Sequence, residues 1–152
     1  LCELGISAKT GAIEAIPFPD ANFDFVVASE VLEHLTPAQR QKGLEEITRT
    51  LKPGGYFIGT VPYRELLDLN VAVCPNCQHV FHRWGHTATF DLATMREELA
   101  PHFGPVSCRT TVFVEFSKRS MAGKLKSIAR LVLAKCGAAI AIPSIFFVAR
   151  KP

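Results

Sequence analysis

The chain has 152 residues, of which 48% are apolar and 20% are charged, and its net charge is +3. This composition suits one globular domain and excludes disordered, collagen-like and disulfide-scaffold proteins. Residues 1–115 contain all 14 acidic residues and nine of the 17 basic ones, whereas residues 116–152 contain eight basic residues and no acidic one. Because phosphate contacts need clustered basic side chains, this distribution argues against a nucleic-acid partner.

The first regular elements are predicted to form a strand–helix–strand unit. Residues 23–28 are a nearly continuous apolar run, typical of a parallel strand covered on both faces. A proline and a capping box at 36–39 predict a helix start, and apolar residues over 44–51 repeat with the spacing of one buried helix face. The Lys-Pro-Gly-Gly sequence at 52–55 is expected to end this helix, and residues 56–61 to form the next strand.

The later elements are predicted from weaker patterns. Residues 64–89 are polar and without periodicity, which predicts a long inserted loop that holds zinc or the acceptor. A short helix is expected from Asp91 as its N-cap. Alternating residues over 111–116 predict a half-exposed antiparallel strand, and residues 144–149 predict the last strand.

A basic amphipathic helix is predicted over 118–140, before the last strand. Its apolar side can lie in a membrane interface, where basic residues are attracted to anionic lipids. It can equally pack on the edge of the sheet or against a partner subunit. It is not predicted to span a membrane, since a transmembrane helix needs about 20 apolar residues.

Four residues have the spacing of a metal site. Cys74 and Cys77 followed by His82 and His86 form the pattern C-x2-C-x4-H-x3-H, and two thiolates with two imidazoles are a common closed zinc set. A metal would also order a loop that lacks an apolar core. His86 has an alternative place beside an acceptor. With no secretory segment, a reducing cytoplasm is the expected compartment, with contact to the inner face of a membrane as an extension of that prediction.

Four short sequence motifs together resemble those of the class I S-adenosylmethionine-dependent methyltransferases. They are IPFPD at 16–20, NFD at 22–24, VLEHL at 31–35 and LKPGG at 51–55, in this order and spacing. The resemblance implies an α/β Rossmann-like, doubly wound, mostly parallel sheet with an antiparallel C-terminal strand pair. It covers most of residues 1–152 as a single partial methyltransferase domain.

The same resemblance implies S-adenosylmethionine as cofactor and assigns residues to it. The cofactor-binding positions that it implies are Ala12, Ile13 and Glu14 beside the adenine, and Ser29, Glu30 and Val31 beside the methionine end and the acceptor. The glycine-rich loop of the family does not occur in these 152 residues. The chain therefore resembles the C-terminal two-thirds of a methyltransferase, and weak or no binding of the cofactor by this chain alone is expected.

The implied reaction is methyl transfer to a small-molecule, lipid-linked or glycan-linked acceptor. The sulfonium supplies an activated methyl group, so the protein has to align the acceptor and accept its proton. Glu30, His34 and His86 are the candidate catalytic residues, with His82 as a further candidate base. The alternative is a non-catalytic protein of the same fold that binds a partner through a zinc-stabilised loop.

Overall fold

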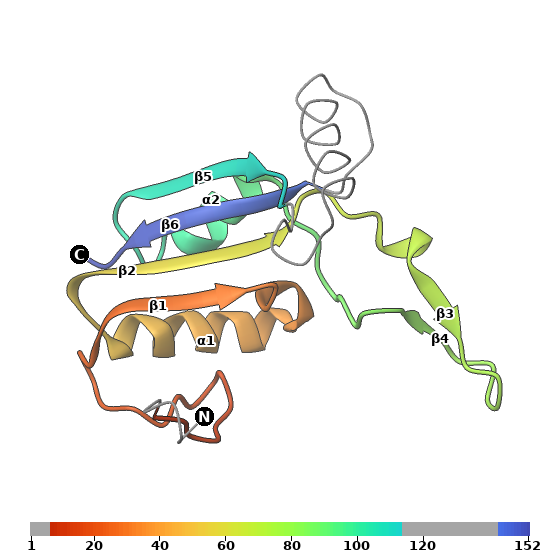
Figure 1. Cartoon of the computed structure of the whole chain (residues 1–152), viewed down its shortest axis with the longest axis horizontal. Coiled ribbons are helices and arrows are strands. Elements are labelled where there is room, and N and C mark those ends of the chain that lie inside the picture. The colour runs from red at the N-terminus through yellow and green to blue at the C-terminus, as the bar shows by residue number, and fades with distance from the viewer. Residues whose placement is uncertain (1–6, 114–142) are drawn as a thin grey trace, which may run out of the picture.

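The computed structural model describes residues 7–113 and 143–152, which form a four-stranded sheet, a separate hairpin and two α-helices (Figure 1). The main sheet has the strand order β1-β2-β6-β5. The elements are β1 (Phe23–Ser29), η2 (Leu32–His34), α1 (Pro37–Thr50), β2 (Leu51–Pro62), η3 (Leu67–Leu69), β3 (Val71–Val73), β4 (Val80–His82), α2 (Leu92–Leu99), β5 (Val106–Thr111) and β6 (Ser144–Arg150).

The predicted strand–helix–strand unit is confirmed as β1, α1 and β2. The two strands are parallel, with Val26 opposite Phe57 in the register. The capping box is present, since the backbone N–H of Gln39 donates to the Thr36 hydroxyl and that of Thr36 donates to the Gln39 amide oxygen. One boundary differs, because β2 begins at Leu51 directly after α1 and includes the predicted turn at 52–55.

The C-terminal strands are antiparallel, as predicted, but one of them lies earlier in the sequence than predicted. Strand β6 runs antiparallel to both β2 and β5. The predicted strand over 111–116 is confirmed only at Thr111, where β5 ends; it is wrong for residues 112–113, and residues 114–116 lie outside the described part. Strand β5 lacks the alternation of apolar and polar residues that indicates a strand. Only Cys108 is buried in it, and its exposed face carries Ser107 and Arg109.

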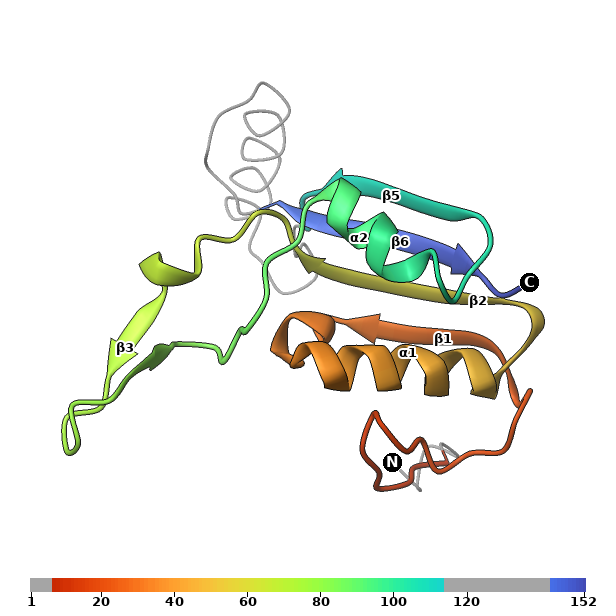
Figure 2. The same ribbon diagram turned by 180° about the vertical axis from the view of Figure 1, so that it is seen from behind.

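Both α-helices cover the same face of the main sheet (Figure 2). Leu44 and Ile47 of α1 and Met95 and Leu99 of α2 are buried in one apolar cluster with inward-facing residues of β2 and β6. Burying a side chain of this size stabilises a fold by about 1.5–3 kcal/mol. Among the described residues the opposite face keeps apolar side chains exposed, including Val27 at 68%.

Residues 64–89 are more regular than the predicted loop. They contain η3 and the antiparallel hairpin of β3 and β4, which projects away from the main sheet in both views (Figures 1 and 2). The helix predicted over 118–140 lies outside the described residues. Within the described ranges, no helix is long and apolar enough to cross a membrane.

Candidate functional site

A cavity of about 470 Å³ lies on the sheet face opposite the helices, and it reaches the carboxyl end of β1. Ser29 and Glu30, two predicted cofactor-binding residues, line it together with Thr60 of β2. The hydroxyls of Ser29 and Thr60 are 2.9 Å apart, and the Glu30 N–H donates to the Thr60 carbonyl at 2.9 Å. Glu30 has a left-handed backbone with a φ of 53°, a strained conformation for a residue other than glycine. Ligands of open α/β sheets bind at this end of the strands.

The other residues assigned to the cofactor have places outside the lining of this cavity. Ile13 is half-buried against α1, and the Glu14 carboxylate accepts a hydrogen bond from the Gln39 amide at 2.9 Å. Ala12 forms a single antiparallel bridge with Ala15, and Val31 packs on the apolar core. Their assignment to the adenine and the methionine end stays a prediction.

A second group of polar side chains gathers where the chain after β4 docks on η2. The Glu33 carbonyl accepts hydrogen bonds from the backbone N–H groups of Thr87 and Ala88, at 2.7 and 3.2 Å. The Thr87 hydroxyl adds a bond to the Leu35 carbonyl at 3.0 Å. These contacts hold His86 beside η2, so that its ring lies edge-on to that of His34 with centroids 4.6 Å apart. The structure therefore brings together two of the three predicted catalytic residues.

His86 is oriented by a buried carboxylate that follows β2. Its Nδ1 is hydrogen-bonded to Glu65 Oε2, and both side chains are at most 10% exposed. Glu65 is held in turn by the Asn70 amide, which donates to Oε1 at 2.9 Å. A carboxylate on one ring nitrogen keeps the proton there, which leaves the lone pair of Nε2 available as a base or a metal ligand.

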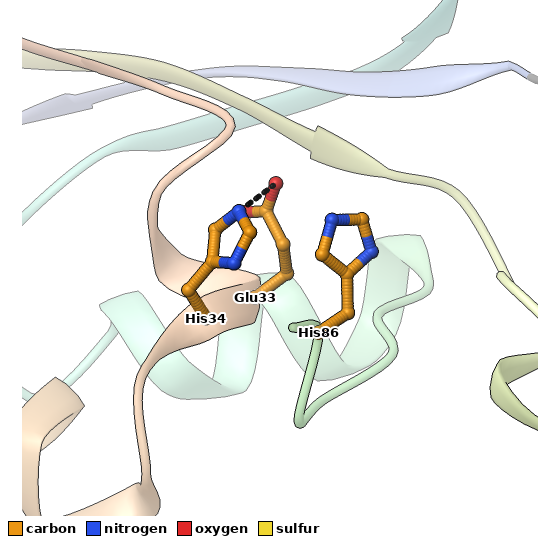
Figure 3. A group of neighbouring side chains, drawn as sticks. All are labelled: Glu33, His34 and His86. Atoms are coloured by element: carbon orange, nitrogen blue, oxygen red, sulfur yellow. Dashed lines mark ion pairs between the residues drawn. The ribbon is translucent and has the colours of Figure 1, made fainter. Parts of the chain in front are cut away.

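Glu33 is the residue that the polar group surrounds. Its side chain is fully buried, and neither carboxylate oxygen has a hydrogen-bond partner among the described residues. His34 Nε2 is 4.0 Å from Oε1, and Figure 3 shows the carboxylate between the rings of His34 and His86. Burial, reinforced by the negative charges of Glu30 and Glu65, raises the pKa of Glu33 to about 7. Glu33, His34 and His86 are called the Glu33 cluster below.

The structure does not assemble the predicted four-residue zinc set. Cys74 and Cys77 lie in the turn between β3 and β4, whereas His82 is paired with Val71 at the other end of the hairpin. Three residues of extended strand separate Val71 from Cys74, about 10 Å. In the described part of the chain, no group of three candidate metal ligands includes either cysteine. Zinc held by the thiolate pair stays a prediction, without His82 and His86 as partners in this geometry.

The thiols differ in expected reactivity. Backbone hydrogen bonds from Cys77 and Asn76 lower the pKa of Cys74, whereas burial raises the pKa of Cys108. Because the thiolate is the nucleophile, iodoacetamide at neutral pH should modify Cys74 faster than Cys108. Peptide mapping by mass spectrometry at successive times measures both rates. Equal rates would contradict the prediction, and protection of Cys74 and Cys77 by added zinc would support metal binding by the pair.

Comparisons with known proteins agree on one family. Residues 3–59 match the methyltransferase domain family. An uncharacterized methyltransferase of Synechocystis is 45% identical over 47 residues, which are 31% of this chain and 22% of that protein. A fatty-acid O-methyltransferase of Mycolicibacterium smegmatis is 43% identical over 56 residues, 37% of this chain and 20% of that protein. These matches support the resemblance to the class I S-adenosylmethionine-dependent methyltransferases over residues 3–59.

The fold of this chain is shared by solved structures. An S-adenosylmethionine-dependent methyltransferase of Thermotoga maritima superposes with a TM-score of 0.62 at 17% identity, covering 99% of this chain and 67% of the other. The curated relatives are matched over only about a fifth of their own length. The predicted Rossmann-like α/β class is thus confirmed, and the family resemblance is supported over residues 3–59.

Sequence analysis missed two members of the polar group, Glu33 and Glu65. Glu33 lies inside the VLEHL motif, and its presence between two leucines could have indicated a buried carboxylate. Glu65 follows the end of β2, the position where ligand-contacting residues of such sheets occur. Its partner His86 is 21 residues later, and no local spacing indicates that pairing.

Proposed function

We propose that this chain takes part in transfer of a methyl group from S-adenosylmethionine to a hydroxyl or other acidic group of a small-molecule, lipid-linked or glycan-linked acceptor. The observation that supports the proposal best is the hydrogen-bonded pair of Glu65 and His86 beside Glu33 and His34. It lies where the family resemblance expects the acceptor. The fatty-acid O-methyltransferase among the relatives favours an oxygen acceptor on a lipid.

The residues of the chain have distinct parts in this proposal. The bound sulfonium supplies a methyl group that is already activated. Ser29, Glu30 and Val31 are proposed to border its methionine end, and Ala12, Ile13 and Glu14 its adenine. As the acceptor oxygen bonds to the methyl carbon and the carbon–sulfur bond breaks, the hydroxyl proton passes to a base. Nε2 of His86 is the proposed base, with His34 and Glu30 as the other candidates.

Radiolabelled methyl transfer tests the proposal. The protein, as its whole gene encodes it, is incubated with labelled S-adenosylmethionine and a panel of fatty acids, lipid-linked alcohols and glycans. We expect label in one acceptor class, and a loss on the order of a hundred- to ten-thousand-fold in His86→Gln. Glu98→Gln is the matched control, because this half-buried carboxylate pairs with Arg40 between α1 and α2.

Two outcomes would count against methyl transfer. Absence of both cofactor binding and transfer would reject the proposal. Cofactor binding without transfer to any acceptor would favour the non-catalytic alternative, a protein of this fold that binds a partner through its 64–89 segment.

A further inference from the structure

The Glu33 cluster has the donor set of a metal centre. One oxygen of Glu33 and one nitrogen each of His34 and His86 all lie within 4.8 Å of one another. Two imidazoles and one carboxylate that leave further coordination positions open are typical of catalytic zinc and of non-heme iron sites. The three residues come from η2 and from the segment after β4, which docks on η2 through backbone hydrogen bonds.

The buried carboxylate is an independent observation that points to a cation. Glu33 is 0% exposed, and both of its oxygens lack a partner among the described residues. Burying an unpaired carboxylate is costly, so buried carboxylates normally pair with a cation or coordinate a metal. The carboxylates of Glu30 and Glu65 add negative charge around the same position.

The hydrogen bonds of His86 fit the role of a ligand. Its Nδ1 is bonded to Glu65, so Nε2 presents its lone pair toward Glu33 and His34 (Figure 3). Metal-binding histidines almost always have their other ring nitrogen bonded to a carboxylate, a backbone carbonyl or water, which fixes the tautomer. Glu65 therefore acts as an orienting residue.

A second group of candidate metal ligands consists of Glu65, His82 and His86. It is less suited to a metal, because its side chains do not all have a free lone pair. His82 Nδ1 accepts the backbone N–H of His86 at 3.0 Å, so Nε2 is the ring nitrogen that carries a proton. Nε2 is the nitrogen that faces Glu65, at 3.5 Å. A nitrogen that carries a proton has no lone pair for a metal. Glu65 is also engaged by Asn70 and His86.

We propose that Glu33, His34 and His86 bind one divalent transition-metal ion, such as zinc, with Glu65 holding His86 in the ligating tautomer. The site is distinct from the thiolate pair at the hairpin turn. The metal site rests on the proposed function and modifies it. With an ion bound, the imidazoles of His34 and His86 are ligands, so Glu30 is the remaining candidate base and the open positions of the ion face the acceptor. Metal binding is measured without cofactor or acceptor, so the two proposals can fail separately.

Titration of the full chain with Zn²⁺ and Co²⁺ tests the site. A Cys74→Ser, Cys77→Ser background removes the hairpin thiolates, and we expect it to bind one ion with unchanged affinity. Adding Glu33→Gln or His86→Gln to this background should weaken binding by more than the roughly 10- to 100-fold that is lost when an orienting residue is removed. His102→Gln and Glu98→Gln are the matched controls, because both side chains line one cavity beside α1 and α2, and each should change the affinity less than threefold.

The cobalt spectrum identifies the ligands directly. We expect visible d–d bands of a nitrogen- and oxygen-ligated ion without a thiolate-to-cobalt charge-transfer band. Loss of binding in the cysteine background, or equal affinities with and without Glu33→Gln, would overturn the proposal, as would failure of the unsubstituted chain to bind either ion. Circular dichroism of each metal-free variant separates loss of a ligand from loss of the fold.

Discussion

Replacing Glu65 with glutamine is expected to lower methyl transfer on the order of a hundred- to ten-thousand-fold, although glutamine has nearly the same shape. The glutamine amide can donate a hydrogen bond to His86 Nδ1, where the carboxylate of Glu65 accepts one. The imidazole proton would then move to Nε2, and the nitrogen that faces Glu33 would lose its lone pair. A wrong tautomer of this kind inactivates catalytic histidines in otherwise intact sites.

Two measurements separate this effect from simple damage to the structure. The nitrogen chemical shifts of His86 report its tautomer, and they should exchange between the two ring positions in Glu65→Gln. The affinity for zinc should fall by roughly 10- to 100-fold in the same variant. Asn70→Ala removes only a hydrogen bond to Glu65, so it should reduce activity less and leave the tautomer unchanged. Unaltered nitrogen shifts in Glu65→Gln would show that Glu65 does not orient His86.

Gly59→Ala is expected to destabilise the fold by about 1–3 kcal/mol, the usual cost of inserting a methyl group into a packed core. A Cβ at this position of β2 would lie 2.4 Å from the Ala28 carbonyl oxygen and 2.4 Å from Cζ of Phe147. Neither neighbour can retreat easily, because Ala28 is in the parallel ladder with β2 and Phe147 is fully buried. The melting temperature should fall by roughly 2–4 °C per kcal/mol.

Gly104→Ala is the matched control for this substitution. Its Cβ would meet only the Arg150 carbonyl oxygen, at 3.6 Å, which is an ordinary contact. We expect a change within about 0.5 kcal/mol in thermal or denaturant unfolding. A melting temperature for Gly59→Ala equal to that of Gly104→Ala would show that the centre of the sheet relaxes around the added methyl group.

Local patterns in the sequence predicted the elements that are stabilised by contacts between residues close together in the chain. The capping box joins residues three apart, and the apolar stripe of α1 repeats within one helix, so both were found without tertiary structure. Strands β1 and β6 were recognisable because they are largely apolar runs. Strand β5 was placed too late in the sequence, since its ladder depends on pairing with β6, more than 30 residues away.

The sequence by itself determined the family resemblance, the parallel strand–helix–strand unit and the candidate status of His34 and His86. Only the tertiary structure decided how these histidines are used. It separated the cysteine pair from His82 and His86, because an extended hairpin holds its two ends apart. It also joined His86 to Glu33 and Glu65, residues 53 and 21 positions earlier in the chain. Such contacts depend on how the segment after β4 docks on the turn after β1, and no local spacing encodes that docking.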